Sequence, residues 1–274
     1  MAAEFEDVLI LCKTYPSPSK KHVELSCVAG ITKTGNLIRL FPVPFRLMRD
    51  EEKFGKWQWI RARIEPSKDS RPESHYIKVD TLTCGVRLDT KNNWQLRREQ
   101  LDKIEIYESL EHLENVRENS GVSLGLIKPH SLIDMEIKES SPEWTKEDIE
   151  KLTKAEKQAS LFDDNNKKPA KILEKIPFDF YYIFTSIVNG TEKQLRTKAI
   201  DWEVGAAYLN FKKLYGDQWK EKFKEKYVTQ FRKKDLSFLI GNHNRFRHQW
   251  MIISIIYPPS EKPVPVTADL FSGF

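Results

Sequence analysis

A short stretch near the end of the chain combines basic and aromatic side chains in the way that nucleic-acid binding requires. In the sequence NHNRFRH, Arg245 and Arg247 flank Phe246. Arginines neutralise phosphates and release counterions, while an adjacent aromatic ring offers a base a face to stack on. Further basic residues lie upstream, on or at the end of two expected helices: Lys212, Lys213, Arg232, Lys233 and Lys234. Together these residues predict a nucleic-acid-binding surface.

The basic stretch has a simpler alternative, a solvated helix face. Glu221 and Glu225 are interleaved with lysines at salt-bridge spacing, which favours that alternative for residues 220–226. The distribution of charge supports binding nevertheless. Residues 193–234 hold twelve basic and five acidic side chains, whereas residues 134–164 hold five basic and ten acidic ones. One segment should attract phosphates and the other should repel them.

The N-terminal part offers a second set of candidate contacts near expected strand turns. Trp57 could stack on a base, and Arg39 adds a basic group close by. In the loop sequence RPES, Arg71 and Glu73 could contact the edge of a ligand through bidentate bonds. Two structural alternatives stay open: Trp57 could belong to the core, and Arg71 could pair with Glu73 to brace the loop.

Catalytic signals are weak. The sequence has no P-loop, GxGxxG, HExxH or GxSxG motif and no cluster of cysteine and histidine. Asp201 and Glu203, in DWEVG, are the candidates for a metal-dependent nuclease, although carboxylates at a helix start also stabilise the free N–H groups there. We therefore expect no cofactor and no metal, with a nuclease or another nucleic-acid-modifying enzyme as the alternative.

Two short motifs could dock on another protein. In KQASLFDDNN, Gln158, Leu161 and Phe162 resemble the pentapeptide by which many bacterial replication and repair proteins bind the sliding clamp. A weaker copy near the end of the chain contains Leu270 and Phe271 but no glutamine. The alternative is that Leu161 and Phe162 pack a helix against its own domain. A pure interaction subunit is therefore a third possible function.

The elements that would carry these residues differ along the chain. VELSCVAGI alternates strictly, and KTGN supplies a glycine turn before LIRLF, which predicts a hairpin. WQWIRARI and HYIKVDTLTCGVRL add strands, so a small barrel is expected, followed by a helix over residues 94–116. Downstream, AIDWEVGAAYLNFKKL and WKEKFKEKYVTQF predict two amphipathic helices, and LSFLIGN and WMIISIIYPP predict two buried strands.

Composition limits the class of protein. The chain has 274 residues, a formal net charge of +5, 39% hydrophobic residues and no stretch long enough to span a membrane. Cys12, Cys27 and Cys84 are odd in number and widely spaced, so buried thiols are expected instead of disulfides. The first residues lack a basic leader followed by a long apolar run. We expect a cytoplasmic protein with no membrane partner.

Several phrases together show a resemblance: KTYPSPSKKHVELSCVAGIT, LIRLFPVPFR, RPES, DWEVGAAY, FLIGNHNRF and IISIIYPP. They resemble an uncharacterised bacterial protein family, and the N-terminal part is similar to nucleotide-modification-associated domains of DNA-modification or phage-defence systems. The resemblance implies a role in DNA metabolism and assigns no activity to single residues. Some relatives carry a cysteine-containing insert before the DWE helix. Here TSIVNGTEKQLRTK holds no cysteine, which argues against a zinc site.

The sequence thus predicts an α+β protein with a small N-terminal β-barrel-like domain (PUA/OB-like) and an α+β C-terminal domain. The expected divisions are residues 1–139, a connector at 140–175, a basic domain at 176–258 and a tail at 259–274. The expected function is binding of nucleic acid, DNA more than RNA, as an accessory protein of a bacterial defence or DNA-modification system. The sliding clamp or another protein of that system is the expected partner.

Overall fold

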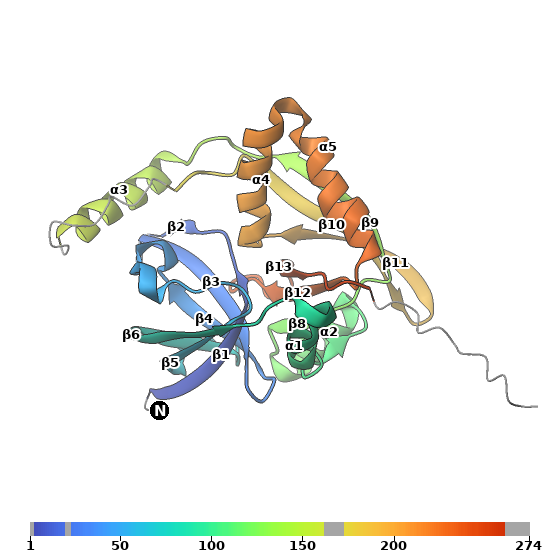
Figure 1. The fold of residues 1–274 in the computed structure, drawn as a ribbon, viewed down its shortest axis with the longest axis horizontal. Coiled ribbons are helices and arrows are strands. Elements are labelled where there is room, and N and C mark those ends of the chain that lie inside the picture. The colour runs from blue at the N-terminus through green and yellow to red at the C-terminus, as the bar shows by residue number, and fades with distance from the viewer. Residues whose placement is uncertain (1–2, 20–22, 162–172, 261–274) are drawn as a thin grey trace, which may run out of the picture.

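The computed structural model describes residues 3–19, 23–161 and 173–260. Figure 1 shows a barrel formed by the first part of the chain lying beside a second sheet, with a helical hairpin standing on that sheet. The predicted α+β class, with a barrel-like N-terminal domain, is confirmed. Within the described residues, no helix is both long and apolar enough to cross a membrane.

Five strands close the barrel in the order β1-β5-β6-β4-β3, because β1 pairs with both β5 and β3. The short strand β2 extends the sheet beyond β3. Their bounds are β1 (Glu4–Lys13), β2 (Ser17–Ser19), β3 (Val23–Thr32), β4 (Leu37–Val43), β5 (Gln58–Pro66) and β6 (Ser74–Arg87). Gly35, at φ +90°, makes the turn of the predicted β3–β4 hairpin, a conformation that glycine adopts without strain.

The second sheet contains seven of the described strands, in the order β7-β8-β12-β13-β11-β10-β9. Their bounds are β7 (Ile106–Tyr107), β8 (Leu124–Ile127), β9 (Ser131–Glu139), β10 (Phe178–Val188), β11 (Thr191–Ala199), β12 (Ser237–Asn242) and β13 (Trp250–Ile256). The segments of β7, β8 and β9 fall within residues 1–139, which were expected to form the barrel-like domain, yet all three strands pair into this sheet. The barrel strands end at Arg87.

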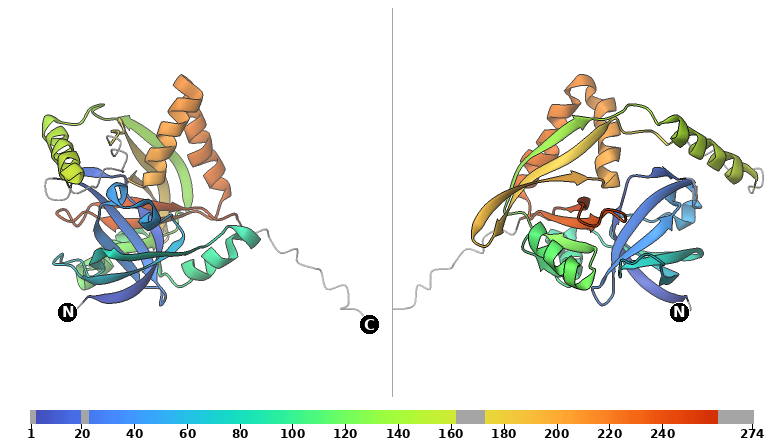
Figure 2. Two further views of the ribbon diagram at one scale, coloured as in Figure 1. Left: turned by 60° about the vertical axis from the view of Figure 1, so that its left-hand side comes forward. Right: turned by 180° about the vertical axis from the view of Figure 1, so that it is seen from behind.

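The main helices are α1 (Lys91–Leu101), α2 (Leu110–Ser120), α3 (Lys146–Leu161), α4 (Trp202–Tyr215) and α5 (Trp219–Lys224). The predicted helix over residues 94–116 is wrong as a single element, because strand β7 separates α1 from α2. Ser109 starts α2 by accepting a hydrogen bond from the His112 amide at 3.0 Å. Figure 2 shows α3 running beside the barrel, near β2 and β3.

The helical hairpin of α4 and α5 packs on the second sheet through aromatic side chains. After α5 the chain forms a π-helical turn over Glu225–Gln230 and a 3-10 turn over Phe231–Lys233. Trp219, Phe223, Tyr227 and Phe231 are all buried in the resulting core. Phe223 stacks on Tyr227 with ring centroids 4.5 Å apart. This core lies apart from the interior of the barrel.

A third core joins the two sheets. Alternate residues of β1 point in opposite directions: Ile10 packs inside the barrel, while Leu9 packs against Leu239 and Ile253 of the second sheet. Hydrogen bonds also cross this junction, from Cys12 Sγ to the Ile253 carbonyl at 2.8 Å and from Ser254 Oγ to the Leu11 carbonyl at 2.8 Å. The apolar run of β1 is continuous because both of its faces are buried.

Candidate nucleic-acid interface

The loop 243–249 connects β12 to β13 and holds the basic and aromatic residues that the sequence singled out. The amides of Arg245 and Phe246 both donate to His243 Nδ1, each at 3.2 Å. The His243 ring also stacks on Phe246, with centroids 5.3 Å apart and the planes inclined by 26°. These contacts give the loop a defined shape although most of its side chains are exposed.

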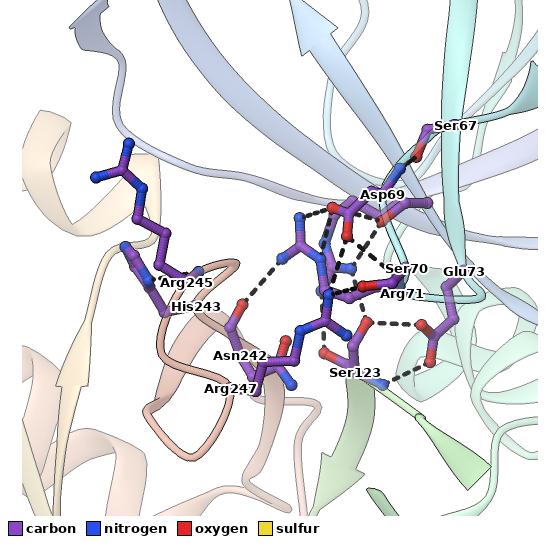
Figure 3. A network of polar contacts seen from close by, with 12 residues as sticks. Ser67, Asp69, Ser70, Arg71, Glu73, Ser123, Asn242, His243, Arg245 and Arg247 are labelled. Atoms are coloured by element: carbon purple, nitrogen blue, oxygen red, sulfur yellow. Dashed lines mark hydrogen bonds and ion pairs between the residues drawn. The ribbon is translucent and has the colours of Figure 1, made fainter.

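Phe246 and Arg245 are both exposed on this loop. Phe246 is 51% exposed, and Arg245 is exposed without a bonding partner for its guanidinium among the residues that the structure describes. Figure 3 shows Arg245 directed away from the polar network that holds the loop. The exposed ring can stack on a base, and the unpaired guanidinium beside it can bind a phosphate.

The base of the loop is tied to the β5–β6 loop through Asp69 (Figure 3). Arg71 donates from Nε to Asp69 Oδ2 at 2.8 Å and from Nη1 to the carbonyl of Asn242 at 3.1 Å. Arg247 lies 3.4 Å from Asp69 Oδ1 and also donates to Ser70 Oγ. One carboxylate thus joins two arginines from segments far apart in the sequence.

Burial and charge act in opposite directions on Asp69. Burial alone would raise its pKa, but hydrogen bonds and the positive charge of Arg71, with Arg247, hold the pKa of this carboxyl below its usual value. Asp69 therefore remains ionised at neutral pH and can anchor both arginines. Arg247 is half-buried and pairs with Asp69, so its side chain holds the loop in place and is less available to a ligand than that of Arg245.

A second layer of the network lies under the first. Arg39 Nη1 donates to Ser123 Oγ at 2.7 Å and to Ser74 Oγ at 3.2 Å. Ser123 in turn donates from its hydroxyl to Glu73 Oε2 at 2.6 Å and from its amide to Glu73 Oε1 at 2.8 Å. Arg39, Ser123 and Glu73 therefore join the barrel to the start of β8.

These contacts revise the roles expected for four residues. Arg39 is 2% exposed and lies in the interior, so the structure makes it a bracing residue and not a surface contact. Arg71 and Glu73 also brace the loop, but they do not pair with each other. Arg71 donates to Asp69, and Glu73 accepts from Ser123. Trp57 is buried beside Trp94 in the core that joins the two sheets, so the alternative that it belongs to the core is the one that the structure supports.

The basic residues of the helical hairpin are less available than their number suggests. Lys212 pairs with Asp217 at 3.2 Å. Arg232 donates from Nε to the Leu132 carbonyl at 2.9 Å and also to the Ile133 carbonyl, where β9 has a bulge. Lys213, Lys233 and Lys234 are exposed. The side chains of these three lysines form no hydrogen bond or ion pair within the part of the chain that the structure describes.

The two carboxylates considered for catalysis have structural partners. Asp201 caps α4 by accepting from the Glu203 amide at 2.9 Å, and its other oxygen accepts from the Ile255 amide at 3.0 Å. Lys56 Nζ lies 3.7 Å from Asp201 and 3.1 Å from Glu203. Burial raises the pKa of Asp201, and the positive charge of Lys56 opposes this effect. This arrangement clamps the barrel to α4 and β13.

Other predicted site residues lie partly beyond what the structure describes. Gln158 and Leu161 fall in the helix α3, where their side chains are outside the description, and Phe162, Leu270 and Phe271 lie outside the described residues altogether. Across the described ranges, no three side chains of histidine, cysteine, aspartate or glutamate group in a way that could hold a metal ion.

Sequence reasoning missed the anchors of the loop. Arg71 and Asn242 are 171 positions apart, and no local pattern marks Asp69 or Ser123 as their partners. Asn242 is itself 4% exposed, and its side-chain amide has no hydrogen-bond partner among the residues that the structure describes. The pairing of β8 with β12, which brings Leu124 opposite Gly241, places Ser123 beside Asn242, whose amide donates to the Ser123 carbonyl at 3.1 Å.

Fold and loop together define an α+β protein that joins a closed β-barrel to a second sheet and exposes a braced basic-aromatic loop. The chain belongs to the family described as domain of unknown function DUF8757, whose model matches residues 103–273. Residues 4–103, which include the barrel, match a second family, domain of unknown function DUF8758. The two matches meet at Lys103.

Comparison with curated proteins found no match. One similar solved structure is described as a replication protein A heterotrimer bound to ssDNA. It shares 9% sequence identity, the alignment covers 95% of this chain and 67% of that chain, and the TM-score is 0.26. A likeness at this TM-score carries no argument about the fold or the function of this chain.

Proposed function

We propose that this protein binds nucleic acid through the loop 243–249, with Phe246 as a stacking platform and Arg245 as a phosphate contact. The observation that carries the proposal is an exposed ring and an unpaired guanidinium on one loop, whose base is held by Asp69, Arg71 and Arg247. A braced loop loses little conformational freedom on binding, which favours affinity.

A second exposed phenylalanine provides a rival surface on the barrel. Phe5, on β1, is 50% exposed, and the guanidinium groups of Arg61 and Arg63 lie 5.4 and 5.1 Å from its ring centre. Two cations already contact that ring, and Arg61 also lies 3.5 Å from Asp7. A base would have to displace these contacts, so the loop 243–249 is the favoured interface.

The resemblance described for the sequence adds two points to the proposal: the kind of nucleic acid and the kind of system in which the protein acts. The sequence resembles an uncharacterised bacterial protein family, and its N-terminal part resembles domains of DNA-modification or phage-defence systems. We therefore favour DNA over RNA as the ligand and an accessory role in such a system. Docking of Leu161 and Phe162 on the sliding clamp is part of the same proposal.

Fluorescence anisotropy with labelled duplex DNA, single-stranded DNA and RNA tests the proposal. Phe246→Ala should weaken binding by roughly 5- to 150-fold, since base stacking on an aromatic side chain contributes about 1–3 kcal/mol. Arg245→Ala should weaken binding and reduce its dependence on salt, because one phosphate contact is lost. Both side chains are exposed, so the melting temperature should change little.

Phe5→Ala is the matched control, because it removes an equally exposed ring that also has arginine neighbours. Under the proposal this variant binds as tightly as the natural protein. If Phe5→Ala weakens binding while Phe246→Ala does not, the interface lies on the barrel. Absence of binding to all three nucleic acids at low salt would refute the function itself.

A further inference from the structure

A cavity of about 570 Å³ opens at one end of the barrel, where the segments 103–107 and 122–124 of the second part of the chain cover the rim. Its floor includes Ile38 and Ile64, which belong to the interior of the barrel. Its walls include Leu37 and Leu124 from the core that joins the sheets. Ligand pockets typically have volumes of about 300–1,000 Å³ and occur at domain junctions and barrel mouths.

The polar groups of this cavity are mainly hydrogen-bond acceptors. Glu6 and Glu105 both line it, and neither forms an ion pair with any residue in the described part of the chain. The remaining glutamate, Glu73, is already satisfied by Ser123, close to Arg39. Glu6 accepts a hydrogen bond from the Asp7 amide at 3.1 Å, and Glu105 accepts one from the Tyr107 phenol. The cavity therefore presents two carboxylates that have hydrogen bonds but no cationic partner in the described part of the chain, beside an apolar surface.

The basic groups that line the cavity form no direct ion pair with these carboxylates in the described part of the chain. Lys103 lines the rim, but its ammonium donates to Gln100 Oε1 at 2.9 Å and to the Lys33 carbonyl at 3.3 Å. His75 Nδ1 donates to the Glu73 carbonyl at 2.9 Å, so this nitrogen is directed at the backbone and not at Glu6 or Glu105. A ligand that supplies N–H donors would satisfy more of the cavity than one that supplies oxygens.

Tyr107 forms part of the same wall and orients the Glu105 carboxylate. Burial raises the pKa of the Tyr107 phenol to about 12, and the charge of Glu105 together with its hydrogen bond adds to this effect. The phenol is therefore neutral and directs its proton to Glu105, which keeps that carboxylate fixed at the cavity wall. A positive charge entering here would meet an oriented acceptor.

We propose that this cavity binds a small organic amine, whose apolar part packs on Ile38, Ile64 and Leu124 and whose ammonium group lies between Glu6 and Glu105. An ammonium ion is the complement of two carboxylates that lack a cationic partner, and the apolar walls exclude water from the rest of the ligand. The site is independent of the loop 243–249, because its negative charge disfavours phosphates.

Three probes of similar shape and different charge test this proposal by calorimetry or by ligand-observed NMR on the full chain. The probes are 2-phenylethylamine, 2-phenylethanol and 3-phenylpropionate. The amine should bind at least tenfold more tightly than the alcohol, and the carboxylate should bind least. Equal binding of all three, preference for the carboxylate, or no binding of the amine at millimolar concentration would each overturn the proposal.

Variants locate the binding site. Glu6→Gln and Glu105→Gln should each weaken amine binding by about tenfold while leaving alcohol binding unchanged, because each removes a charge and keeps most of the side chain. Glu4→Gln is the matched control, since Glu4 lies on the same strand but does not line the cavity. Equal amine affinity in all three variants would place binding elsewhere and refute the assignment. DNA binding measured in parallel should be the same in each variant.

Discussion

At the scale of single residues, the most unusual group is a lysine held against aromatic rings. Lys13 Nζ lies 3.8 Å from the centre of the Phe45 ring and donates to the Phe54 carbonyl at 3.0 Å. It also lies 5.3 Å from the centre of the Trp202 ring. Burial lowers the pKa of Lys13 from 10.5 to about 8, although the charge of Glu203 acts to raise it.

This pKa predicts how the stability of the protein changes at alkaline pH. The unfolded chain keeps the Lys13 proton up to pH 10.5, whereas the folded chain releases it from about pH 8. Between these values the unfolded state binds more protons, so the free energy of unfolding contributed by Lys13 rises with pH. Replacing the lysine by an uncharged chain of similar length, Lys13→Met, should abolish this rise.

Chemical denaturation of both proteins across this pH range measures the effect. The difference in free energy of unfolding, natural protein minus Lys13→Met, should increase from pH 8 to pH 10.5. Taking the difference cancels the contributions of other titrating groups. A constant difference over this range would show that the ammonium of Lys13 is as well solvated in the folded state as in the unfolded chain.

At the scale of elements, Asp201 connects three segments. It caps α4, accepts from the backbone of β13 and lies beside the buried ammonium of Lys56. We expect Asp201→Ala to destabilise the protein by about 3 kcal/mol, through loss of the cap and removal of one partner from a buried charge pair. Thermal or denaturant unfolding measures this, with Asp217→Ala as an exposed control.

The Asp201→Ala variant also distinguishes a structural role of Asp201 from a functional one. If Asp201 serves the fold, the loss of DNA binding in Asp201→Ala should follow the fraction of unfolded protein and be recovered at lower temperature. A fully folded Asp201→Ala protein, as stable as the Asp217→Ala control, would contradict the structural role. It would return Asp201 to consideration as a functional carboxylate.

The elements also show what the sequence could predict. Strict alternation and the turn at Gly35 predicted the β3–β4 hairpin, and steps of three and four residues predicted α4, because both signals are local. The second amphipathic stretch, with aromatics at every fourth residue, predicted a helix but not its form. Apolar residues four apart drift around an α-helix, and the wider π-helical turn keeps Tyr227 and Phe231 facing the core.

The site was predictable only in part, because local sequence patterns show residue types but not their partners in the fold. The basic and aromatic types in the loop 243–249 are visible in the sequence, since phosphate and base contacts require those side chains. Their availability is not visible, because it depends on pairing partners that only the fold supplies. Arg39 and Arg247 look alike in the sequence as basic candidates, yet one is buried and the other is half-buried against Asp69.

At the scale of the whole molecule, a shared core joins the barrel to the second sheet, so we expect the two to unfold as one cooperative unit. Leu9, Leu239 and Ile253 are packed in one cluster although they come from opposite ends of the chain. The junction also carries the polar clamps of Lys56 and Arg71. Since the loop 243–249 is anchored across this junction, its shape depends on both halves.

We predict that a cavity made in this junction weakens both sheets together. Leu239→Ala removes a fully buried side chain and should cost about 2–5 kcal/mol. Amide hydrogen exchange followed by mass spectrometry should show faster exchange in β1 and β3 as well as in β12. Faster exchange confined to the second sheet would mean that the two halves unfold independently.

The central claim is that the loop 243–249 is the nucleic-acid interface. Amide hydrogen exchange of the full chain, alone and saturated with duplex DNA at low salt, tests it most directly. We predict slower exchange in peptides covering 243–249 and, through the Asp69 anchor, 67–73, with little change in β1 and β5. Slower exchange confined to the barrel or to the α4–α5 hairpin, with residues 243–249 unchanged, would contradict the account.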